Sequence, residues 1–192
     1  MPARIHLIRH GQSTFNAAVA VSPFTDPMLF DPPLSARGWA EVAELRGRMD
    51  PVELVLTSPL TRAVQTALSV FGDSGVPMVV EPLLREGVDS RGDIGSRPSV
   101  LAAAFPTLDF SHLDDPWWFC DPAVPRVLRI EPEARIRARV AALRNRLAGL
   151  LAGLSARSVA VIGHGGFFNH MIGERLGNCA VVTGTWGTGP FA

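Results

Sequence analysis

The sequence predicts an α/β fold, a three-layer α/β/α sandwich around a mostly parallel central sheet. Short apolar stretches alternate along the chain with longer stretches whose apolar residues recur every three or four positions. The first pattern is typical of buried strands and the second of amphipathic helices. Strands that alternate with helices form a mostly parallel sheet with helices on both faces.

The N-terminal quarter holds one strand and at least one well-bounded helix. The apolar segment 5–8 predicts the first strand, which ends where polar residues begin at Arg9. Several prolines make 22–34 irregular. Ser35 is a suitable N-cap, and the apolar residues after it keep helical spacing until Pro51 ends the helix.

The next elements repeat the strand–helix alternation. Segment 52–57 is apolar on both faces, as expected of a buried parallel strand. The stretch 58–72 has one apolar helical face, and Gly72 fits a C-terminal cap. A third strand is expected at 77–82.

The amino-acid composition changes at about 87–130, where Gly, Asp, Ser and Pro dominate. We interpret this stretch as an irregular insertion over one edge of the fold, with a short helix at 98–105. The whole chain, 1–192, is expected to form one domain that includes this insertion, because 192 residues suit one domain and no internal repeat is present.

The last third of the chain predicts the longest helix, at 132–154, a fourth strand at 158–163, a helix at 166–176 and a fifth strand at 179–183. The apolar stripe of the long helix consists of Ile136, Val140, Leu143, Leu147, Leu150 and Leu154. Its arginines lie mostly off this stripe, so we expect them to face solvent.

Composition excludes several classes of function. The formal net charge is zero, from 18 basic and 18 acidic residues, so no global field attracts nucleic acid or a membrane surface. All the basic residues are arginine, which excludes lysine-dependent Schiff-base and P-loop chemistry. Cys120 and Cys179 have neither zinc-site spacing nor the number for a disulfide framework. The start lacks the apolar core of a signal peptide, and the longest run of aliphatic and small residues, 147–154, is too short to cross a bilayer. We therefore expect a cytoplasmic protein.

Chemically competent side chains follow the predicted strands. Arg9 and His10 follow the first, Arg62 lies one turn into the helix after the second, Glu86 lies beyond the third, and His164 follows the fourth. In open α/β sheets, ligands bind at the carboxyl ends of the strands. These five side chains are therefore expected to meet at one edge of the sheet.

This set of side chains suits the transfer of a phosphoryl group. Two guanidiniums can hold its oxygens, one imidazole can attack phosphorus, and the other can donate a hydrogen bond to the developing charge. A carboxylic acid can protonate the departing alkoxide and then activate water. Ser13, Asn16 and the backbone N–H groups of the helix after the first strand can complete the cradle, although both side chains could instead cap that helix.

Four blocks of the sequence carry a family resemblance. RHGQSTFN, PLSARG, SPLTRAVQTA and VIGHGGF resemble, in this order, the motifs of the histidine phosphatase superfamily, which has the phosphoglycerate mutase-like fold. The resemblance runs from residue 4 to about 176 and is weakest across 87–130. It implies that His10 is the nucleophile that becomes phosphohistidine, that Arg9, Arg62 and His164 hold the phosphoryl group, and that no metal or organic cofactor takes part.

The acid/base is expected to be Glu86, which lies in an "L.RE" stretch just past the third strand, with Asp93 as the second candidate. A metal site built from His10, His164 and Glu86 is disfavoured, because two arginines in the pocket would repel a cation. A neutral nucleophile combined with a protonated acid predicts an activity optimum below neutrality.

The leading functional hypothesis is a metal-independent phosphomonoester hydrolase acting on a small phosphorylated substrate. The alternatives are a cofactor-dependent phosphoglycerate mutase, disfavoured by chain length and the lack of lysine, and a non-catalytic phosphate-binding module. The cluster Trp117, Trp118 and Phe119 favours core or lid packing over closure on the substrate. The residues that select the substrate are expected in 22–34 and 87–130, and a homodimer is left open. His6, His112 and His170 are expected to be structural.

Overall fold

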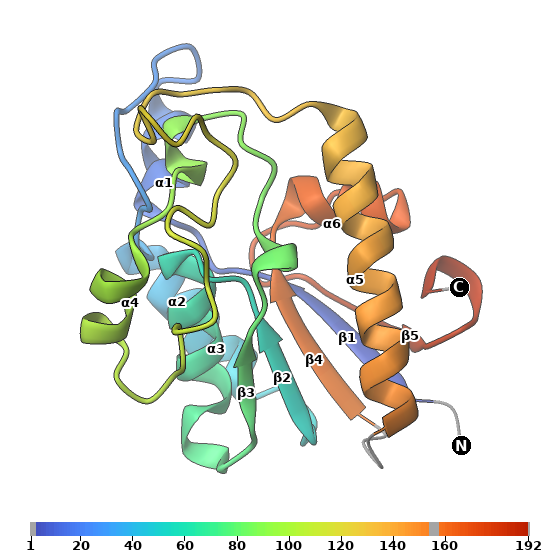
Figure 1. The fold of residues 1–192 in the computed structure, drawn as a ribbon. Helices are drawn as coiled ribbons and strands as arrows, with labels where there is room; N and C mark the ends of the chain where they lie inside the picture. Colours follow the sequence, from blue (N-terminus) through green and yellow to red (C-terminus); the bar gives the residue numbers. More distant parts are fainter. Residues whose placement is uncertain (1–2, 154–157, 192) are drawn as a thin grey trace.

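The fold is built on a five-stranded sheet with the order β3-β2-β4-β1-β5 (Figure 1). The computed structural model describes residues 3–153 and 158–191. Four strands are parallel, and β5 pairs antiparallel with β1 at one edge. The strands are β1 Arg4–Arg9, β2 Leu54–Thr57, β3 Met78–Val80, β4 Ser158–Gly163 and β5 Val181–Thr185. The mostly parallel sheet predicted from the sequence is confirmed.

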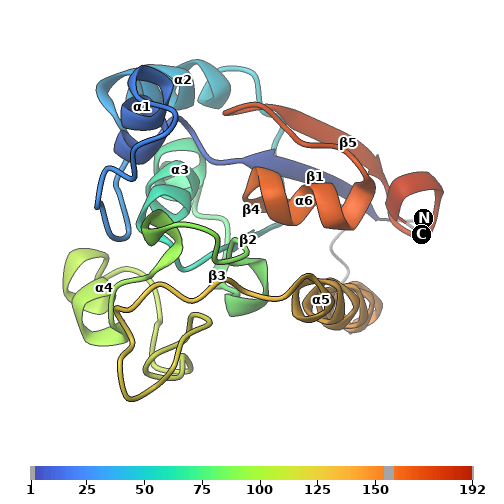
Figure 2. The same ribbon diagram turned by 90° about the horizontal axis from the view of Figure 1, so that it is seen from above.

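Helices cover both faces of this sheet (Figure 2). They are α1 Thr14–Val21, α2 Ala36–Arg46, α3 Thr61–Phe71, α4 Pro98–Ala104, α5 Glu133–Gly153 and α6 Gly165–Ile172. Two 3₁₀ turns near the candidate site are η2 Pro82–Leu84 and η3 Arg91–Asp93. The side chains of alternate strand residues enter opposite layers, as the period of a strand requires.

Two apolar cores lie on the two faces of the sheet. On one face, Leu7 and Val161 belong to a cluster that includes the apolar stripe of α5 and the two phenylalanines of α6. On the other face, Ile8 and Ile162 pack with the apolar sides of α2 and α3. The predicted three-layer α/β/α sandwich is therefore confirmed.

The loop after β1 is held in place by α2. The backbone N–H of Ser35 donates to the carbonyl oxygen of Gln12 at 2.8 Å, and Ser35 caps α2 as predicted. A Cβ atom at Gly38 would lie 2.0 Å from that same carbonyl oxygen, so only glycine permits this approach. The segment PLSARG therefore positions the loop that carries His10.

Several predicted boundaries were wrong, because single backbone conformations end the elements. The helix α2 ends at Arg46 and not before Pro51. The helix α6 ends at Ile172, one turn early, because Gly173 is left-handed with φ 76°. The last strand begins at Val181, because Cys179 turns the chain with φ 52°. Gly72 is the C-cap of α3, as predicted, although its conformation is right-handed and the left-handed residue is Gly75. The predicted end of the long helix at Leu154 lies outside the described residues.

Segment 87–130 is mostly irregular, as predicted, and forms a third apolar cluster with α3 and β3. Trp117 and Trp118 are buried there in an edge-to-face pair with their ring centres 5.5 Å apart. The indole N–H of Trp117 donates to Ser96 and that of Trp118 to Pro125. These two rings are therefore core residues and do not line the candidate site described below.

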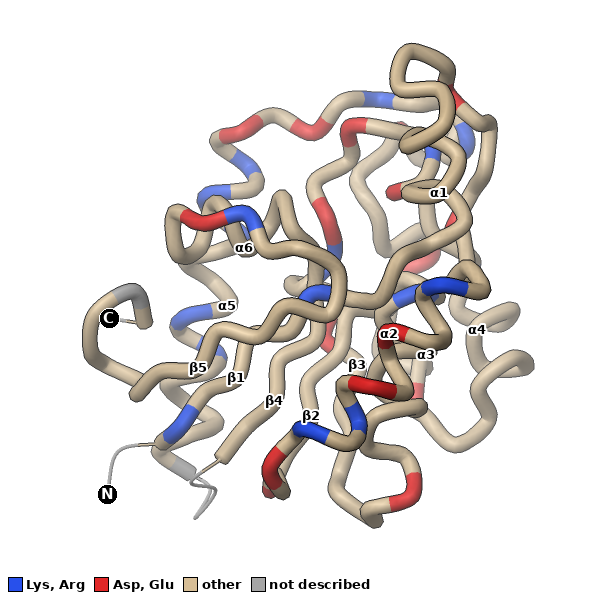
Figure 3. The backbone as a smooth tube through the Cα atoms, turned by 180° about the vertical axis from the view of Figure 1, so that it is seen from behind, with Lys and Arg blue, Asp and Glu red and all other residues tan. Residues whose placement is uncertain are grey.

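Charged residues of both signs are interspersed along the chain, as Figure 3 shows. The expectation that the arginines of α5 all face solvent is wrong for Arg139, which is 6% exposed. In the part of the chain that the structure describes, no helix has both the length and the apolar character to cross a membrane.

Candidate active site

The side chains expected to act together lie at the carboxyl ends of three neighbouring parallel strands. Arg9 is the last residue of β1 and His10 follows it, His164 follows β4, and Arg62 is the second residue of the helix after β2. The rings of His10 and His164 have centroids 5.0 Å apart. A pocket of about 220 Å³ has Arg9, His10, Arg62 and Glu86 in its wall, and His164 lies behind His10 and does not line it.

His10 is held as a neutral imidazole with a defined tautomer. Its Nδ1 lies 2.7 Å from the carbonyl oxygen of Gly11, which can only accept, so Nδ1 carries the proton. Burial lowers its pKa well below the usual value, and the charges of Arg62 and Arg9 lower it further. The lone pair of Nε2 therefore serves as the nucleophile or acceptor of this residue.

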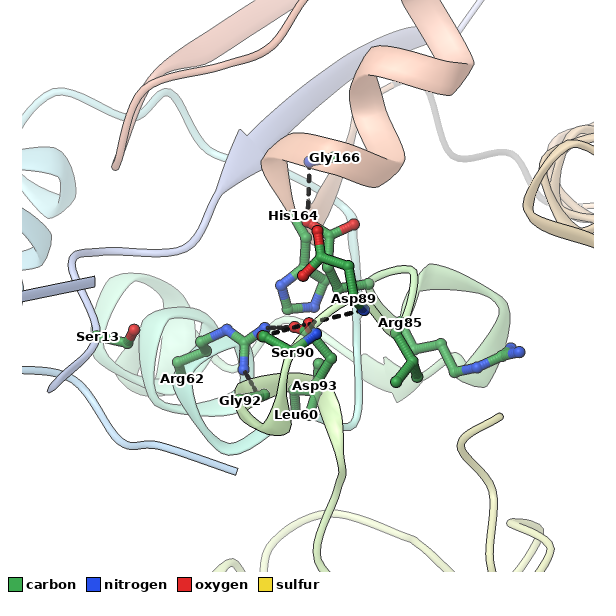
Figure 4. Close-up of polar contacts among 12 residues, drawn as sticks. Ser13, Leu60, Arg62, Arg85, Asp89, Ser90, Gly92, Asp93, His164 and Gly166 are labelled. Carbon is green, nitrogen blue, oxygen red and sulfur yellow. Dashed lines mark hydrogen bonds and ion pairs between the residues drawn. The ribbon is translucent and has the colours of Figure 1, made fainter. Parts of the chain in front are cut away.

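Arg62 is a cation in the first turn of α3, where the helix macrodipole disfavours a positive charge, and a neighbouring anion compensates for this. The anionic partner is Asp93, whose Oδ1 accepts from Nη2 at 2.9 Å, and both side chains are 6% exposed (Figure 4). Nη1 donates to the carbonyl oxygen of Gly92 at 2.7 Å, and Nε donates to His10 Nε2 at 3.2 Å. The guanidinium is thus fixed on three sides, and Arg62 lines the pocket.

His164 is fully buried and is oriented by Ser58, whose hydroxyl lies 2.8 Å from Nε2. The Ser58 oxygen also accepts from the N–H of Leu60 at 3.3 Å. When the Ser58 hydroxyl donates to Nε2, the ring proton of His164 is on Nδ1. Among the described residues, Nδ1 has no hydrogen-bond partner. Burial and the charge of Arg62 hold the pKa of His164 well below its usual value, which favours a neutral ring.

In the Arg9 guanidinium, Nη1 is hydrogen-bonded to the protein and Nε is unpaired among the described residues. Its Nη1 donates to the carbonyl oxygen of Leu176 at 2.8 Å, while the buried Nε meets no acceptor within the described ranges. Burial lowers its pKa, the charge of Glu86 opposes this effect, and the charges of Arg175 and Arg62 add to it. A buried cationic donor without an acceptor indicates a site suited to an anion.

Glu86 is placed against the beginning of α6. Its carboxylate accepts from the N–H of Gly166 at 2.8 Å and from the N–H of Gly87 at 3.0 Å. Burial raises its pKa, and the charge of Asp93 raises it further, against the effect of those two N–H donors. A Cβ atom at Gly166 would lie 2.8 Å from Oε1, so glycine at this position lets the carboxyl group approach the helix.

The two candidates for the acid/base are in different environments. Asp93 is engaged by Arg62 through Oδ1 and by the hydroxyl of Ser90 through Oδ2 at 2.8 Å. Glu86 accepts only backbone N–H groups among its described hydrogen bonds and borders the same pocket. A third carboxyl, Asp89, has its pKa raised to about 6 by burial and by the neighbouring Asp93. This geometry favours Glu86 for proton transfer and Asp93 for holding Arg62.

Ser13 and Asn16 form a capping box at the start of α1. The Ser13 hydroxyl accepts from the N–H of Asn16 at 3.1 Å, and the Asn16 side-chain oxygen accepts from the N–H of Ser13 at 3.1 Å. Both residues border the pocket. Only their oxygens are used as acceptors in the box, so the Ser13 hydroxyl proton and the Asn16 amide protons can still be offered to an anion.

The other histidines lie outside this pocket. His6 bridges the hydroxyls of Thr183 and Ser158, and His112 donates to the carbonyl oxygen of Val80 at 2.8 Å. His170 lies 4.0 Å from Glu133. A larger hollow of about 580 Å³ between α2 and β5 contains neither His10 nor His164. Over the described ranges, no group of three His, Cys, Asp or Glu residues could hold a metal ion.

Sequence reasoning missed two supporting residues. Ser58, which orients His164, was visible only as the residue at the end of the second strand. Asp93 was considered only as an acid and not as the partner of Arg62, because the turn that brings η3 against α3 leaves no periodic signal in the sequence.

Comparison with solved structures places the fold in the phosphoglycerate mutase-like class. An alpha-ribazole phosphatase from Shigella flexneri superimposes with a TM-score of 0.62 at 21% identity, covering 94% of this chain and 89% of that one. A phosphoglycerate mutase from Thermus thermophilus gives a TM-score of 0.57 at 21% identity, covering 97% and 95%. At these identities the likeness concerns the fold alone.

The family is established by the sequence as a whole. The model of the histidine phosphatase superfamily (branch 1) matches residues 5–180, and the chain belongs to this family. A protein of Schizosaccharomyces pombe named as a probable phosphatase is 30% identical over 135 residues, which are 66% of this chain. The match spans 58% of that protein's length, so the chain corresponds to less than two thirds of this relative.

Proposed function

We propose that this chain is a metal-independent phosphomonoester hydrolase that acts through a phosphohistidine at His10. The observation that carries the proposal is the buried pair of imidazoles beside Arg9 and Arg62: Nε2 of His10 carries a lone pair that faces the Nε–H of Arg62, and Nδ1 of His164 has no hydrogen-bond partner among the described residues. A site of this kind suits a phosphoryl group better than a neutral ligand, because its unpaired groups are cationic or hydrogen-bond donors.

In the first step, Nε2 of His10 attacks phosphorus and the bond from phosphorus to the ester oxygen breaks. Arg9, Arg62 and His164 donate to the phosphoryl oxygens, and the N–H of Arg62 that points to His10 turns to one of them. Glu86, kept protonated by burial, gives its proton to the leaving oxygen. In the second step, the Glu86 carboxylate takes a proton from water as water attacks phosphorus, the bond from phosphorus to Nε2 of His10 breaks, and inorganic phosphate leaves.

Substrate choice belongs to the outer part of the pocket. Phe15 and Val19 from α1 border it on one side, with Asp89 and Arg175 also in its wall. A volume of about 220 Å³ holds a phosphoryl group and a small alcohol. This volume supports a small phosphorylated substrate, and we propose a cytoplasmic, cofactor-free enzyme.

Hydrolysis of 4-nitrophenyl phosphate in the presence of EDTA tests this proposal. We expect wild-type activity to survive the chelator and to fall to the background rate in His10→Ala. Activity lost with EDTA, or retained in His10→Ala, would contradict it. The mutase alternative is tested with a phosphoglycerate, with and without a bisphosphoglycerate primer, and isomerisation that depends on the primer would favour it.

A further inference from the structure

Arg139 of α5 donates hydrogen bonds to the backbone of the segment that carries Glu86. Its Nη1 donates to the carbonyl oxygen of Leu83 at 2.9 Å and also to that of Arg85. Its Nη2 reaches the carbonyl oxygen of Glu86 at 3.4 Å. One guanidinium therefore binds three backbone carbonyls within four residues of irregular chain.

Arg139 is itself fixed by buried contacts. Its Nη2 donates to the carboxylate of Glu131 at 3.1 Å, and its guanidinium lies over the ring of Phe167 with 4.7 Å to the centroid. Glu131 has a side chain 1% exposed and also accepts from Arg85 at 2.9 Å. The backbone N–H of Glu131 donates to the carbonyl oxygen of Val88 at 2.8 Å, so Glu131 contacts the chain on both sides of Glu86.

The packing of α5 against the sheet does not require the buried hydrogen bonds and ion pair of Arg139. The helix α5 already buries Val140, Leu143 and Leu147 against the sheet. Burying an ion pair costs desolvation free energy, and apolar residues of similar volume often stabilise a fold as well or better. Arg137, two residues earlier on the same helix, shows the ordinary case: its side chain is 71% exposed and pairs with Glu133 on the same helix.

We propose that Arg139, anchored by Glu131, is a positioning residue that fixes the backbone of 83–86 so that the carboxyl group of Glu86 faces the leaving oxygen. This inference rests on the proposed function. The proton that Glu86 gives travels to the leaving oxygen as the bond from phosphorus to that oxygen breaks, so a small displacement of the carboxyl group slows this first step, which kcat/KM reports, only for leaving groups that need the proton.

Two aryl phosphates separate this role from a structural one. The 4-nitrophenolate group leaves without protonation, whereas phenolate is more basic and benefits from an acid. The quantity measured is the ratio of kcat/KM for 4-nitrophenyl phosphate to kcat/KM for phenyl phosphate. We expect Glu86→Gln to raise this ratio by about a hundredfold and Arg139→Lys by about tenfold. Loss of folded protein lowers both values equally and leaves the ratio unchanged.

Two further variants complete the experiment. Glu131→Gln keeps the guanidinium but loosens its anchor, so it should raise the ratio in the same direction, and it decides the question if Arg139→Lys is insoluble. Arg137→Met is the matched control and should leave the ratio at the wild-type value. A raised ratio in the first two variants, with the control unchanged, supports the inference.

Three other results would contradict different parts of this account. An unchanged ratio in Arg139→Lys and Glu131→Gln, when Glu86→Gln raises it, overturns the positioning role and leaves the proposed function standing. An unchanged ratio in Glu86→Gln removes Glu86 as the acid and the inference with it. A wild-type chain that cleaves neither ester overturns the proposed function itself.

Discussion

The Nε–H of Arg62 points at Nε2 of His10 across 3.2 Å, so the atom proposed to attack phosphorus is also the acceptor of a cationic donor. This contact has two consequences. The guanidinium disfavours a second proton on His10, which keeps the nucleophile neutral. It also places an N–H where a phosphoryl oxygen would lie during attack, so activation and binding depend on the same pair.

The pH dependence of kcat/KM follows from the directions of two pKa shifts. His10 must be neutral, a condition met above its lowered pKa, and Glu86 must be protonated, a condition met below its raised pKa. The rate should therefore be greatest below neutrality and should fall as pH rises through the pKa of Glu86. The profile for phenyl phosphate measures this. A rate that increases steadily above pH 8 would contradict the assignment, and Glu86→Gln should lose the alkaline decline.

Asp93→Ala should strongly destabilise the fold, because Arg62 is left as an unpaired buried charge. Breaking a buried ion pair from one side costs about 3–5 kcal/mol in the free energy of unfolding, which urea denaturation measures. Asp93→Asn should cost less and lower activity on both aryl phosphates together. If instead it raises the ratio of the two rates as Glu86→Gln does, Asp93 is the acid.

Gly166→Ala should reduce activity by about tenfold or more by pushing the Glu86 carboxyl group away from α6, because the added Cβ would lie 2.8 Å from Oε1. Steady-state kinetics and a thermal melt check this effect. The matched control is Gly149→Ala in α5, where a Cβ meets nothing within 4 Å and alanine should stabilise the helix by up to about 1 kcal/mol. Full activity in Gly166→Ala would show that the position of Glu86 does not matter.

Trp117→Phe should destabilise the third core cluster without changing catalysis. The indole N–H donates to Ser96 at 2.8 Å, and the ring lies against Gly95, where a Cβ would be 2.2 Å from it. Loss of the buried hydrogen bond and of ring volume should cost about 1–4 kcal/mol, measured by urea denaturation. KM for 4-nitrophenyl phosphate should stay at the wild-type value. A several-fold rise in KM would mean that this ring contacts the substrate after all.

Local patterns were enough to predict the layers and to bring the candidate site residues to one edge of the sheet. Strands such as β1 and β4 are apolar runs, and their carboxyl ends must lie together in a parallel sheet, which brings His10 near His164. The sequence does not predict the contacts that the irregular segments make. The helical pattern does not distinguish Arg139 from an exposed arginine, and Arg139 is buried because the segment around Glu86, Glu131 and the ring of Phe167 contact it.

The central claim is the phosphohistidine at His10, and its most direct test is to trap it. The enzyme is mixed with excess 4-nitrophenyl phosphate, quenched in alkali within milliseconds, and digested for mass spectrometry at high pH. We predict one phosphate per chain on the peptide containing His10, labile to acid and stable to base, and absent from His10→Ala and from denatured controls. Steady turnover with no phosphate on that peptide, or with an acid-stable phosphate on Ser13 or another residue, would contradict the mechanism.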